Sequence, residues 1–133
     1  LYVGVGGAFT GTWRPIRERW PDVVRTVVEP AESAVISGHP PGTHRIEGGG
    51  VGFVPPLITD DAYDRVEMVS TEDAFESARQ LARVEGVWTG PSGGASILGA
   101  IRLARDLGPG HTVVTVQPDS GLKYLSGDLY RYS

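Results

Sequence analysis

The chain alternates between short apolar runs and longer stretches in which apolar residues recur at helical spacing. The short runs are rich in β-branched residues and predict buried strands; they lie at residues 2–5, 23–28, 65–69, 87–89 and 112–116. The helical spacing predicts three helices, over residues 10–20, 71–85 and 93–107. Strands that alternate with helices are typical of parallel sheets. We therefore expect an α/β fold, a three-layer domain with a mainly parallel sheet and helices on both faces.

The second predicted helix has the clearest end signals. Ser70 precedes it and Asp73 follows three residues later, which is a capping-box-like start with Asp in place of the usual Glu or Gln. Gly86 stands where the glycine that ends a helix is expected. The third predicted helix stops at Gly108.

The sequence contains 19 glycines, and several of them cluster where predicted strands meet predicted helices. Two such junctions are Gly4–Ala8 and Gly90–Gly94, with a glycine- and proline-rich loop at residues 37–56 between them. Backbone N–H groups converge at the start of a helix, and open parallel sheets bind ligands where strand ends face helix starts. We expect both junctions at one edge of the sheet, around a ligand. Tight turns without a ligand are the alternative.

The charge balance and the lack of cysteine narrow the function classes. The net charge is −4 and no basic block occurs, which disfavours nucleic acid as a partner. No apolar run approaches the ~20 residues that span a bilayer, so no membrane partner is expected. Without cysteine the sequence has no disulfide, no catalytic thiolate and no cysteine metal site. The prediction is a cytoplasmic protein whose residues 1–133 belong to one domain.

Common catalytic motifs are absent from the sequence. Gly4 and Gly6 are followed by Phe9 rather than a third glycine, so the dinucleotide pattern G-x-G-x-x-G is not met, and no P-loop motif occurs. No serine has the local context of a nucleophile elbow. A metal site is not expected, because the histidines are scattered; they are His39, His44 and His111.

Five motifs occur in the order found in one enzyme family. The opening glycine loop is followed by VEPAESAVISG (28–38), HRIEGGGVGFVP (44–55), VSTEDAFESARQLARVEGVWTGPSGGAS (69–96) and PDSGLKYLS (118–126). Together they resemble the C-terminal half of a cysteine synthase or cystathionine β-synthase, and the resemblance covers nearly the whole chain. These are pyridoxal-phosphate enzymes of the tryptophan-synthase-β fold, also called fold type II. The resemblance implies pyridoxal 5′-phosphate as the cofactor and a small amino acid as the substrate.

The resemblance assigns the cofactor phosphate to the first glycine loop, where the family usually has G-T-G-G-T. The residues of this loop are Gly4, Val5, Gly6, Gly7 and Ala8. Val5 and Ala8 stand where threonine hydroxyls would normally help to bind the phosphate. Two hydrogen bonds to a charged group, each worth roughly 1.5–3 kcal/mol, are therefore absent. This implies weaker cofactor binding or compensation from elsewhere.

Two further assignments follow from the resemblance. Ser92 matches the serine whose hydroxyl meets the cofactor's pyridine nitrogen, a contact that suits β-elimination followed by β-addition. Taken alone, Ser92 could equally be a helix N-cap. The second assignment is the family's mobile loop at the substrate mouth, which corresponds here to Glu47, Gly48, Gly49 and Gly50. The family commonly has Gln where Glu47 stands and Ile where Gly49 stands. The added carboxylate of Glu47 bears on which amino acid or nucleophile enters.

The family's catalytic lysine, which carries the cofactor as a Schiff base, lies upstream of the glycine loop. The only lysine here is Lys123, in the closing motif, and nothing marks it as that residue. We therefore expect this chain to be the C-terminal portion of an enzyme, inactive alone, that works with the missing N-terminal part as a homodimer. The expected reaction joins an activated serine to sulfide, a thiol or another nucleophile and gives cysteine or an analogue.

A non-catalytic remnant that keeps the fold as a binding module is the alternative function. Val5 and Ala8 favour this alternative, because they remove hydroxyls from the expected phosphate site. Ser92 and the full set of motifs oppose it, and an active subfamily could also tolerate both replacements.

Overall fold

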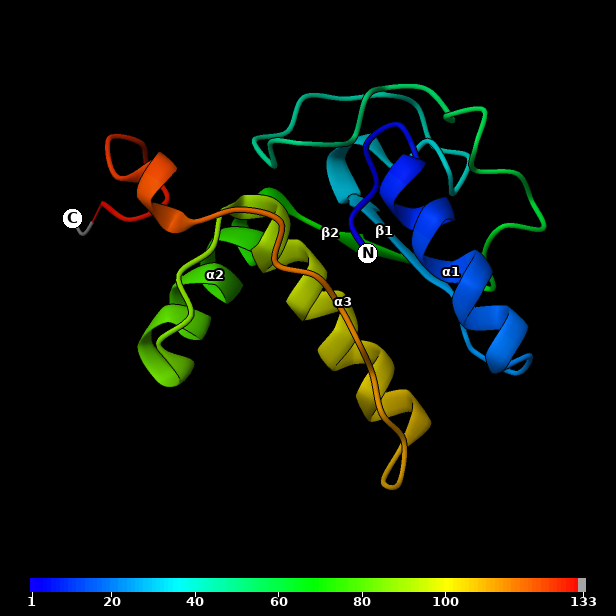
Figure 1. Cartoon of the computed structure of the whole chain (residues 1–133). Helices are drawn as coiled ribbons and strands as arrows, with labels where there is room; N and C mark the ends of the chain where they lie inside the picture. The colour runs from blue at the N-terminus through cyan, green and yellow to red at the C-terminus, as the bar shows by residue number, and fades with distance from the viewer. Residues whose placement is uncertain (132–133) are drawn as a thin grey trace.

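The computed structural model describes residues 1–131 and consists of three α-helices, two paired strands and two short 3-10 turns (Figure 1). In chain order the elements are α1 (Gly7–Arg19), β1 (Thr26–Pro30), η1 (Ala31–Ser33), β2 (Arg65–Val69), α2 (Thr71–Glu85), α3 (Pro91–Leu107) and η2 (Gly121–Tyr124). None of the helices within residues 1–131 has the length and apolar character needed to cross a membrane.

The two strands pair in parallel and are covered by helices on both faces. Thr26 lies opposite Arg65, and Tyr2 adds an isolated parallel bridge on the other edge of β1. Successive residues of β1 point to opposite faces: Val27 packs in a cluster with Phe9 of α1, whereas Val28 packs in a cluster with Ala95 of α3. The predicted α/β layering with helices on both faces is therefore confirmed.

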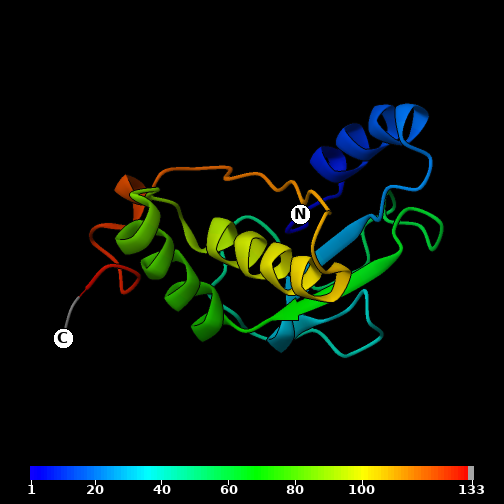
Figure 2. The same cartoon turned by 90° about the horizontal axis from the view of Figure 1, so that it is seen from below.

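Helices α2 and α3 lie side by side in both views (Figures 1 and 2). The Ser70 hydroxyl caps α2 by accepting a hydrogen bond from the Asp73 N–H at 3.1 Å, and Gly86 ends the helix in the left-handed conformation with φ 67°. Both end signals read from the sequence are confirmed, and α2 has the predicted limits.

The predicted strands at 87–89 and 112–116 are wrong for this chain. Both segments are extended but carry no ladder of backbone hydrogen bonds, because neither has a neighbouring strand within residues 1–131. Residues 112–116 run back along α3 with the Val114 side chain 80% exposed. The strand predicted at 2–5 is reduced to the single bridge at Tyr2 for the same reason, and β1 begins at Thr26 rather than at residue 23.

The long segment between β1 and β2 contains only the turn η1, in agreement with the predicted loop at 37–56. Buried polar contacts hold its two ends. The Glu29 carboxylate accepts hydrogen bonds from the N–H groups of Ile36 and Ser37 at 2.8 and 2.9 Å. At the other end Arg25, 6% exposed, donates two side-chain hydrogen bonds to the Asp64 carboxylate. These anchors fix where the loop leaves and rejoins the sheet.

Candidate functional site

Three segments that are distant in sequence meet at the carboxyl end of β1. A methyl group placed on Gly4 would lie 2.7 Å from the carbonyl oxygen of Gly48, so the two backbones touch. A methyl group on Gly48 would in turn lie 3.8 Å from the Ser92 hydroxyl oxygen. The first glycine loop, the loop at 47–50 and the start of α3 therefore surround one place, as expected for two junctions at one sheet edge.

Backbone and side-chain hydrogen bonds hold the loop at 47–50 against the start of the chain. The Gly50 N–H donates to the Val3 carbonyl at 3.2 Å, and the Tyr2 hydroxyl donates to the Ile46 carbonyl at 2.9 Å. Gly49 has no room for a side chain, since a methyl group there would lie 2.3 Å from the Val3 carbonyl oxygen. Burial and the negative charge of Glu32 raise the pKa of Tyr2, so its hydroxyl stays a donor at neutral pH.

The start of α1 presents backbone donors that have no hydrogen-bond partner within residues 1–131. Gly6 is the N-cap, in the left-handed conformation with φ 90°, and the first intrahelical hydrogen bond runs from the Thr10 N–H to the Gly6 carbonyl. No side chain caps this end, and Gly7 and Ala8 are exposed. Free N–H groups and the positive end of the helix dipole favour an anion at this place.

Ser92 lies in the first turn of α3, and its hydroxyl makes no hydrogen bond within residues 1–131. The N-cap is Gly90, two residues earlier, and no side chain caps the helix. Ser92 is therefore not the helix N-cap, which was the structural alternative for this residue. With 6% of its surface exposed, it offers a nearly buried hydroxyl that is free to bond a ligand.

The closing segment, residues 118–126, holds the start of α3 in place through hydrogen bonds. The Asp119 carboxylate accepts hydrogen bonds from the Gly90 N–H at 2.9 Å and from the Tyr124 hydroxyl at 2.6 Å. Burial and the neighbouring Asp119 raise the pKa of Tyr124 to about 12. The sequence motif PDSG contains Asp119, but its role was not foreseen. The available signal was an acidic residue three positions after a predicted strand, at the edge where the glycine junctions were expected.

Replacing Asp119 with alanine should destabilise the chain by roughly 2–3 kcal/mol. The change removes two charge-assisted hydrogen bonds and leaves the Gly90 N–H and the Tyr124 hydroxyl without an acceptor. The matched control is Asp128→Ala, because Asp128 is 68% exposed and pairs only at the surface with Arg45. Urea unfolding should place the control within about 1 kcal/mol of the parent. Equal losses for the two variants would show that Asp119 does not support the junction.

An exposed ion pair joins the loop at 47–50 to the closing segment. The Lys123 ammonium lies 3.3 Å from the Glu47 carboxylate, and this hydrogen bond raises the pKa of Lys123. A lysine held in its charged form is a poor nucleophile. The residue that the sequence singled out as the only lysine therefore occupies a structural contact at the mouth of the site.

Comparison with known proteins decides the family of the chain. A family model described as pyridoxal-phosphate dependent enzyme matches residues 1–119. The chain belongs to this family. Cofactor and fold type follow from that membership, and both agree with the resemblance read from the five motifs.

Named relatives within the family are cysteine synthases. A probable cysteine synthase of Bacillus subtilis is 44% identical over 97% of this chain, and a cysteine synthase of Staphylococcus aureus is 40% identical over 98%. The chain spans 42% of the length of each of these relatives.

Solved structures of the same kind superpose on nearly the whole chain. An O-acetyl serine sulfhydrylase of Entamoeba histolytica has a TM-score of 0.92 with 37% identity; 97% of this chain and 39% of that chain are covered. An O-acetylserine dependent cystathionine β-synthase of Helicobacter pylori has a TM-score of 0.91 with 40% identity; 97% of this chain and 42% of that chain are covered. The fold is therefore that of the pyridoxal-phosphate enzymes of fold type II.

Proposed function

We propose that the chain is the C-terminal, cofactor-holding portion of an enzyme that joins an activated serine to sulfide, a thiol or another nucleophile. The product would be cysteine or an analogue. The observation that carries the proposal is the meeting of the uncapped start of α1, the loop at 47–50 and the unbonded Ser92 hydroxyl at one sheet edge. The relatives named cysteine synthase and O-acetylserine-dependent enzyme support the reaction class.

The residues at this edge fit pyridoxal phosphate. The N–H groups of Gly7 and Ala8 are exposed at the positive end of α1 and would bind the phosphate. Val5 and Ala8 bring no hydroxyl, and both are exposed, so the backbone carries this contact. Ser92 would bond the pyridine nitrogen, since its hydroxyl has no partner in the described part of the chain. When bound, the cofactor withdraws electrons from the α-carbon of the amino acid attached to it.

The loop at 47–50 would form the substrate mouth. Gly48 lies near Ser92, since a methyl group placed on Gly48 would lie 3.8 Å from the Ser92 hydroxyl oxygen. The hydrogen bond from the Gly50 N–H to the Val3 carbonyl, and that from the Tyr2 hydroxyl to the neighbouring Ile46 carbonyl, hold the loop there. Closed in this position, the loop excludes water from the reacting atoms. The Glu47 carboxylate, paired with Lys123, adds charge at the mouth and so influences which substrates enter.

The proposal includes further parts that lie outside the chain. The catalytic lysine is expected in an N-terminal part, which is supported by relatives of which this chain spans 42%. The chain alone is expected to make no cysteine, because its lysine, Lys123, lies in the closing motif and not upstream of the glycine loop, where the family's catalytic lysine stands. The family resemblance is the basis for a homodimeric and cytoplasmic enzyme with a small amino acid as substrate.

A chimera tests the proposal. Residues of this chain replace the matching portion of the Staphylococcus aureus cysteine synthase, which contributes the remaining part. The chimera should bind pyridoxal phosphate and form cysteine from O-acetylserine and sulfide, whereas the isolated chain should form none. Ser92→Ala in the chimera should keep the cofactor bound but lower the rate roughly tenfold, the equivalent of one lost hydrogen bond. Ser126→Ala, at an exposed serine of the closing segment, is the matched control.

Two outcomes would contradict the proposal. A folded chimera that binds the cofactor without turnover would favour the non-catalytic binding module. Cysteine formation by the isolated chain, with Lys123 labelled after borohydride reduction, would contradict the need for a lysine from the N-terminal part.

A further inference from the structure

His44 makes hydrogen bonds at both ring nitrogens, and these bonds join the two ends of the loop at 47–50. Its Nδ1 accepts a hydrogen bond from the Ile46 N–H at 3.2 Å. Its Nε2 lies 2.9 Å from the Gly50 carbonyl oxygen. The imidazole ring therefore bridges the residue directly before the loop and the last residue of the loop.

The two partners determine which nitrogen of the His44 ring carries the proton. The Ile46 N–H is a donor and the Gly50 carbonyl is an acceptor, so Nδ1 offers a lone pair and Nε2 carries the hydrogen. The bridge requires the neutral ring, because a protonated ring carries hydrogen on both nitrogens and cannot accept a bond at Nδ1. Backbone groups on both sides of the ring therefore select one tautomer, the Nε2–H form.

The remaining backbone groups at the two ends of the loop are also bonded. The Ile46 carbonyl accepts a hydrogen bond from the Tyr2 hydroxyl, and the Gly50 N–H donates to the Val3 carbonyl. Gly50 has a φ of 63°, and a methyl group there would lie 2.4 Å from His44 Nε2, so the ring packs directly against the Gly50 backbone. Ile46 and Gly50 are therefore fixed points, and the rest of the loop is suspended between them.

The backbone next to His44 is anchored to α2. The Arg45 N–H donates a hydrogen bond to the hydroxyl of Thr71, the first residue of α2, at 3.0 Å. Thr71 is buried, and its own N–H donates to the Glu32 carboxylate at 2.7 Å. The ring of His44 is thus attached to the fold through its own backbone, and it holds the loop from a fixed base.

Gly48 lies between the two fixed points and faces Ser92. A methyl group on Gly48 would lie 3.8 Å from the Ser92 Oγ and 4.0 Å from the Ser92 Cβ, so one Hα of Gly48 points at this side chain. The Gly48 backbone makes no hydrogen bond within residues 1–131. Its position therefore follows from packing against Gly4 and from the fixed ends of the loop.

We propose that His44 is the positioning residue of the loop at 47–50 and sets the opening between Gly48 and Ser92. Its neutral ring is a bridge of fixed length between Ile46 and Gly50. Without the bridge the two ends of the loop separate and Gly48 moves away from Ser92. The inference rests on the proposed function in one respect: the opening governs entry of the amino acid because this loop forms the substrate mouth.

Two substitutions each keep one half of the bridge, and amide hydrogen exchange of the full chain separates them. His44→Asn places an oxygen near the position of Nδ1 and should keep the bond from the Ile46 N–H. His44→Gln places an amide nitrogen near the position of Nε2 and should keep the bond to the Gly50 carbonyl. The Gln variant should therefore speed exchange of the Ile46 amide roughly five- to tenfold, and the Asn variant that of the Gly50 amide. His44→Ala should speed both.

His39→Ala is the matched control. His39 lies in the same long segment, is exposed, and makes no side-chain hydrogen bond in the part of the chain that the structure describes. Its replacement should leave exchange at both amides unchanged.

Nuclear magnetic resonance of the same variants reports the tautomer and the opening. In the parent chain the nitrogen spectrum of the His44 ring should show hydrogen on Nε2 and a lone pair on Nδ1. A nuclear Overhauser contact should join a Gly48 Hα to the Ser92 Hβ atoms in the parent and in His39→Ala. The same contact should be lost in His44→Ala.

Three results would each overturn the proposal: hydrogen on Nδ1 of the ring, equal exchange in the Asn and Gln variants, or a contact between Gly48 and Ser92 that survives in His44→Ala. If His44→Ala does not fold, the crossed exchange pattern of the Asn and Gln variants decides the question. Every measurement uses the chain without cofactor or substrate. Failure of the chimera to make cysteine would therefore contradict the proposed function and leave the bridge unaffected.

Discussion

Replacing Gly94 with alanine should destabilise the chain by about 3 kcal/mol or more, as measured by urea unfolding. A methyl group on Gly94 would lie 2.0 Å from the carbonyl oxygen of Ala74 and 3.0 Å from the Ala78 side chain. Its nearest neighbour is thus backbone, which cannot move aside without separating α2 from α3. Overpacking of this kind typically costs 1–3 kcal/mol and more where backbone must shift.

Gly11→Ala is the matched control for this prediction. Gly11 lies inside α1, has no positive φ, and has nothing within 4 Å of a methyl group placed on it. Alanine there should raise the free energy of unfolding by about 0.5–1 kcal/mol, because it favours the helix and restricts the unfolded chain. A loss at Gly11 as large as that at Gly94 would mean that helix propensity, not helix contact, governs both sites.

The contact at Gly94 also explains how the fold places the candidate site. Ser92 lies one turn or less from Gly94 in α3, and α2 holds that end of the helix through Ala74 and Ala78. Small residues let the two helices approach closely enough to fix the position of the Ser92 hydroxyl. A substitution at Gly94 should therefore loosen cofactor contacts that it does not itself make.

Local sequence signals made α2 predictable. By contrast, the sequence could not predict that residues 87–89 and 112–116 would stay unpaired. Ser70 and Gly86 act on their own helix, so their effect can be read without knowledge of the fold. Residues 112–116 have the composition of a strand, but a strand also needs a partner on its edge. Composition indicates that a segment favours the extended conformation, but it does not show whether a partner strand lies beside it. The structure shows the segment extended and unpaired.

The candidate site shows the same division between local and distant information. Glycine clustering and the family motifs pointed to Gly4, Gly48 and Ser92, and the structure brings these residues together. Asp119 was not foreseen as a support, because its hydrogen bond to the Gly90 N–H spans 29 residues and depends on how the chain returns along α3. Motif order predicts which segments matter, while the contacts between them come from packing.

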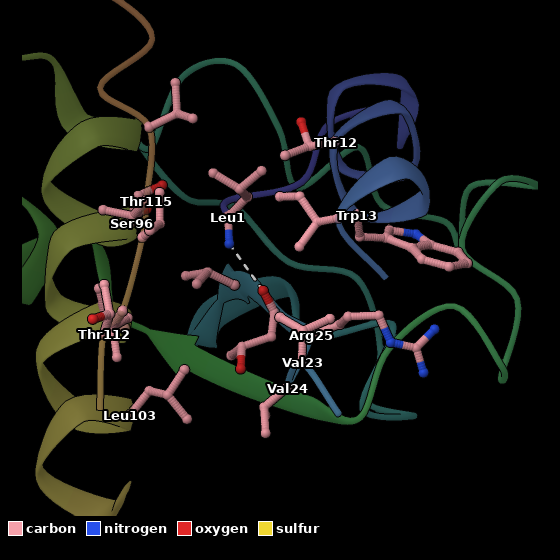
Figure 3. A pocket seen from close by; sticks show the side chains of 18 of the residues that line it. Leu1, Thr12, Trp13, Val23, Val24, Arg25, Ser96, Leu103, Thr112 and Thr115 are labelled. Carbon is pink, nitrogen blue, oxygen red and sulfur yellow. Dashed lines mark hydrogen bonds between the residues drawn. The ribbon is translucent and has the colours of Figure 1, made fainter. Parts of the chain in front are cut away.

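Lowering the pH from 8 to 6 should reduce the free energy of unfolding of the chain by about 2–3 kcal/mol. The Leu1 amino group donates a hydrogen bond to the Thr26 carbonyl at 2.9 Å (Figure 3), and burial lowers its pKa from 8.0 to about 6. In the unfolded chain the group keeps its ordinary pKa, so between pH 6 and 8 the unfolded state binds more protons than the folded state. Stability from this group is complete above pH 8 and is lost as the pH falls to 6.

Acetylation of Leu1 isolates the contribution of its amino group from every other source of pH dependence. Since a tenfold change in proton affinity corresponds to about 1.4 kcal/mol, the two-unit depression accounts for the predicted loss. The acetylated chain carries no ammonium group and should lack this part of the pH dependence when both forms are unfolded in urea at pH 6, 7 and 8. Parallel curves for the two forms would show that the amino group is solvated in the folded chain and would contradict the prediction.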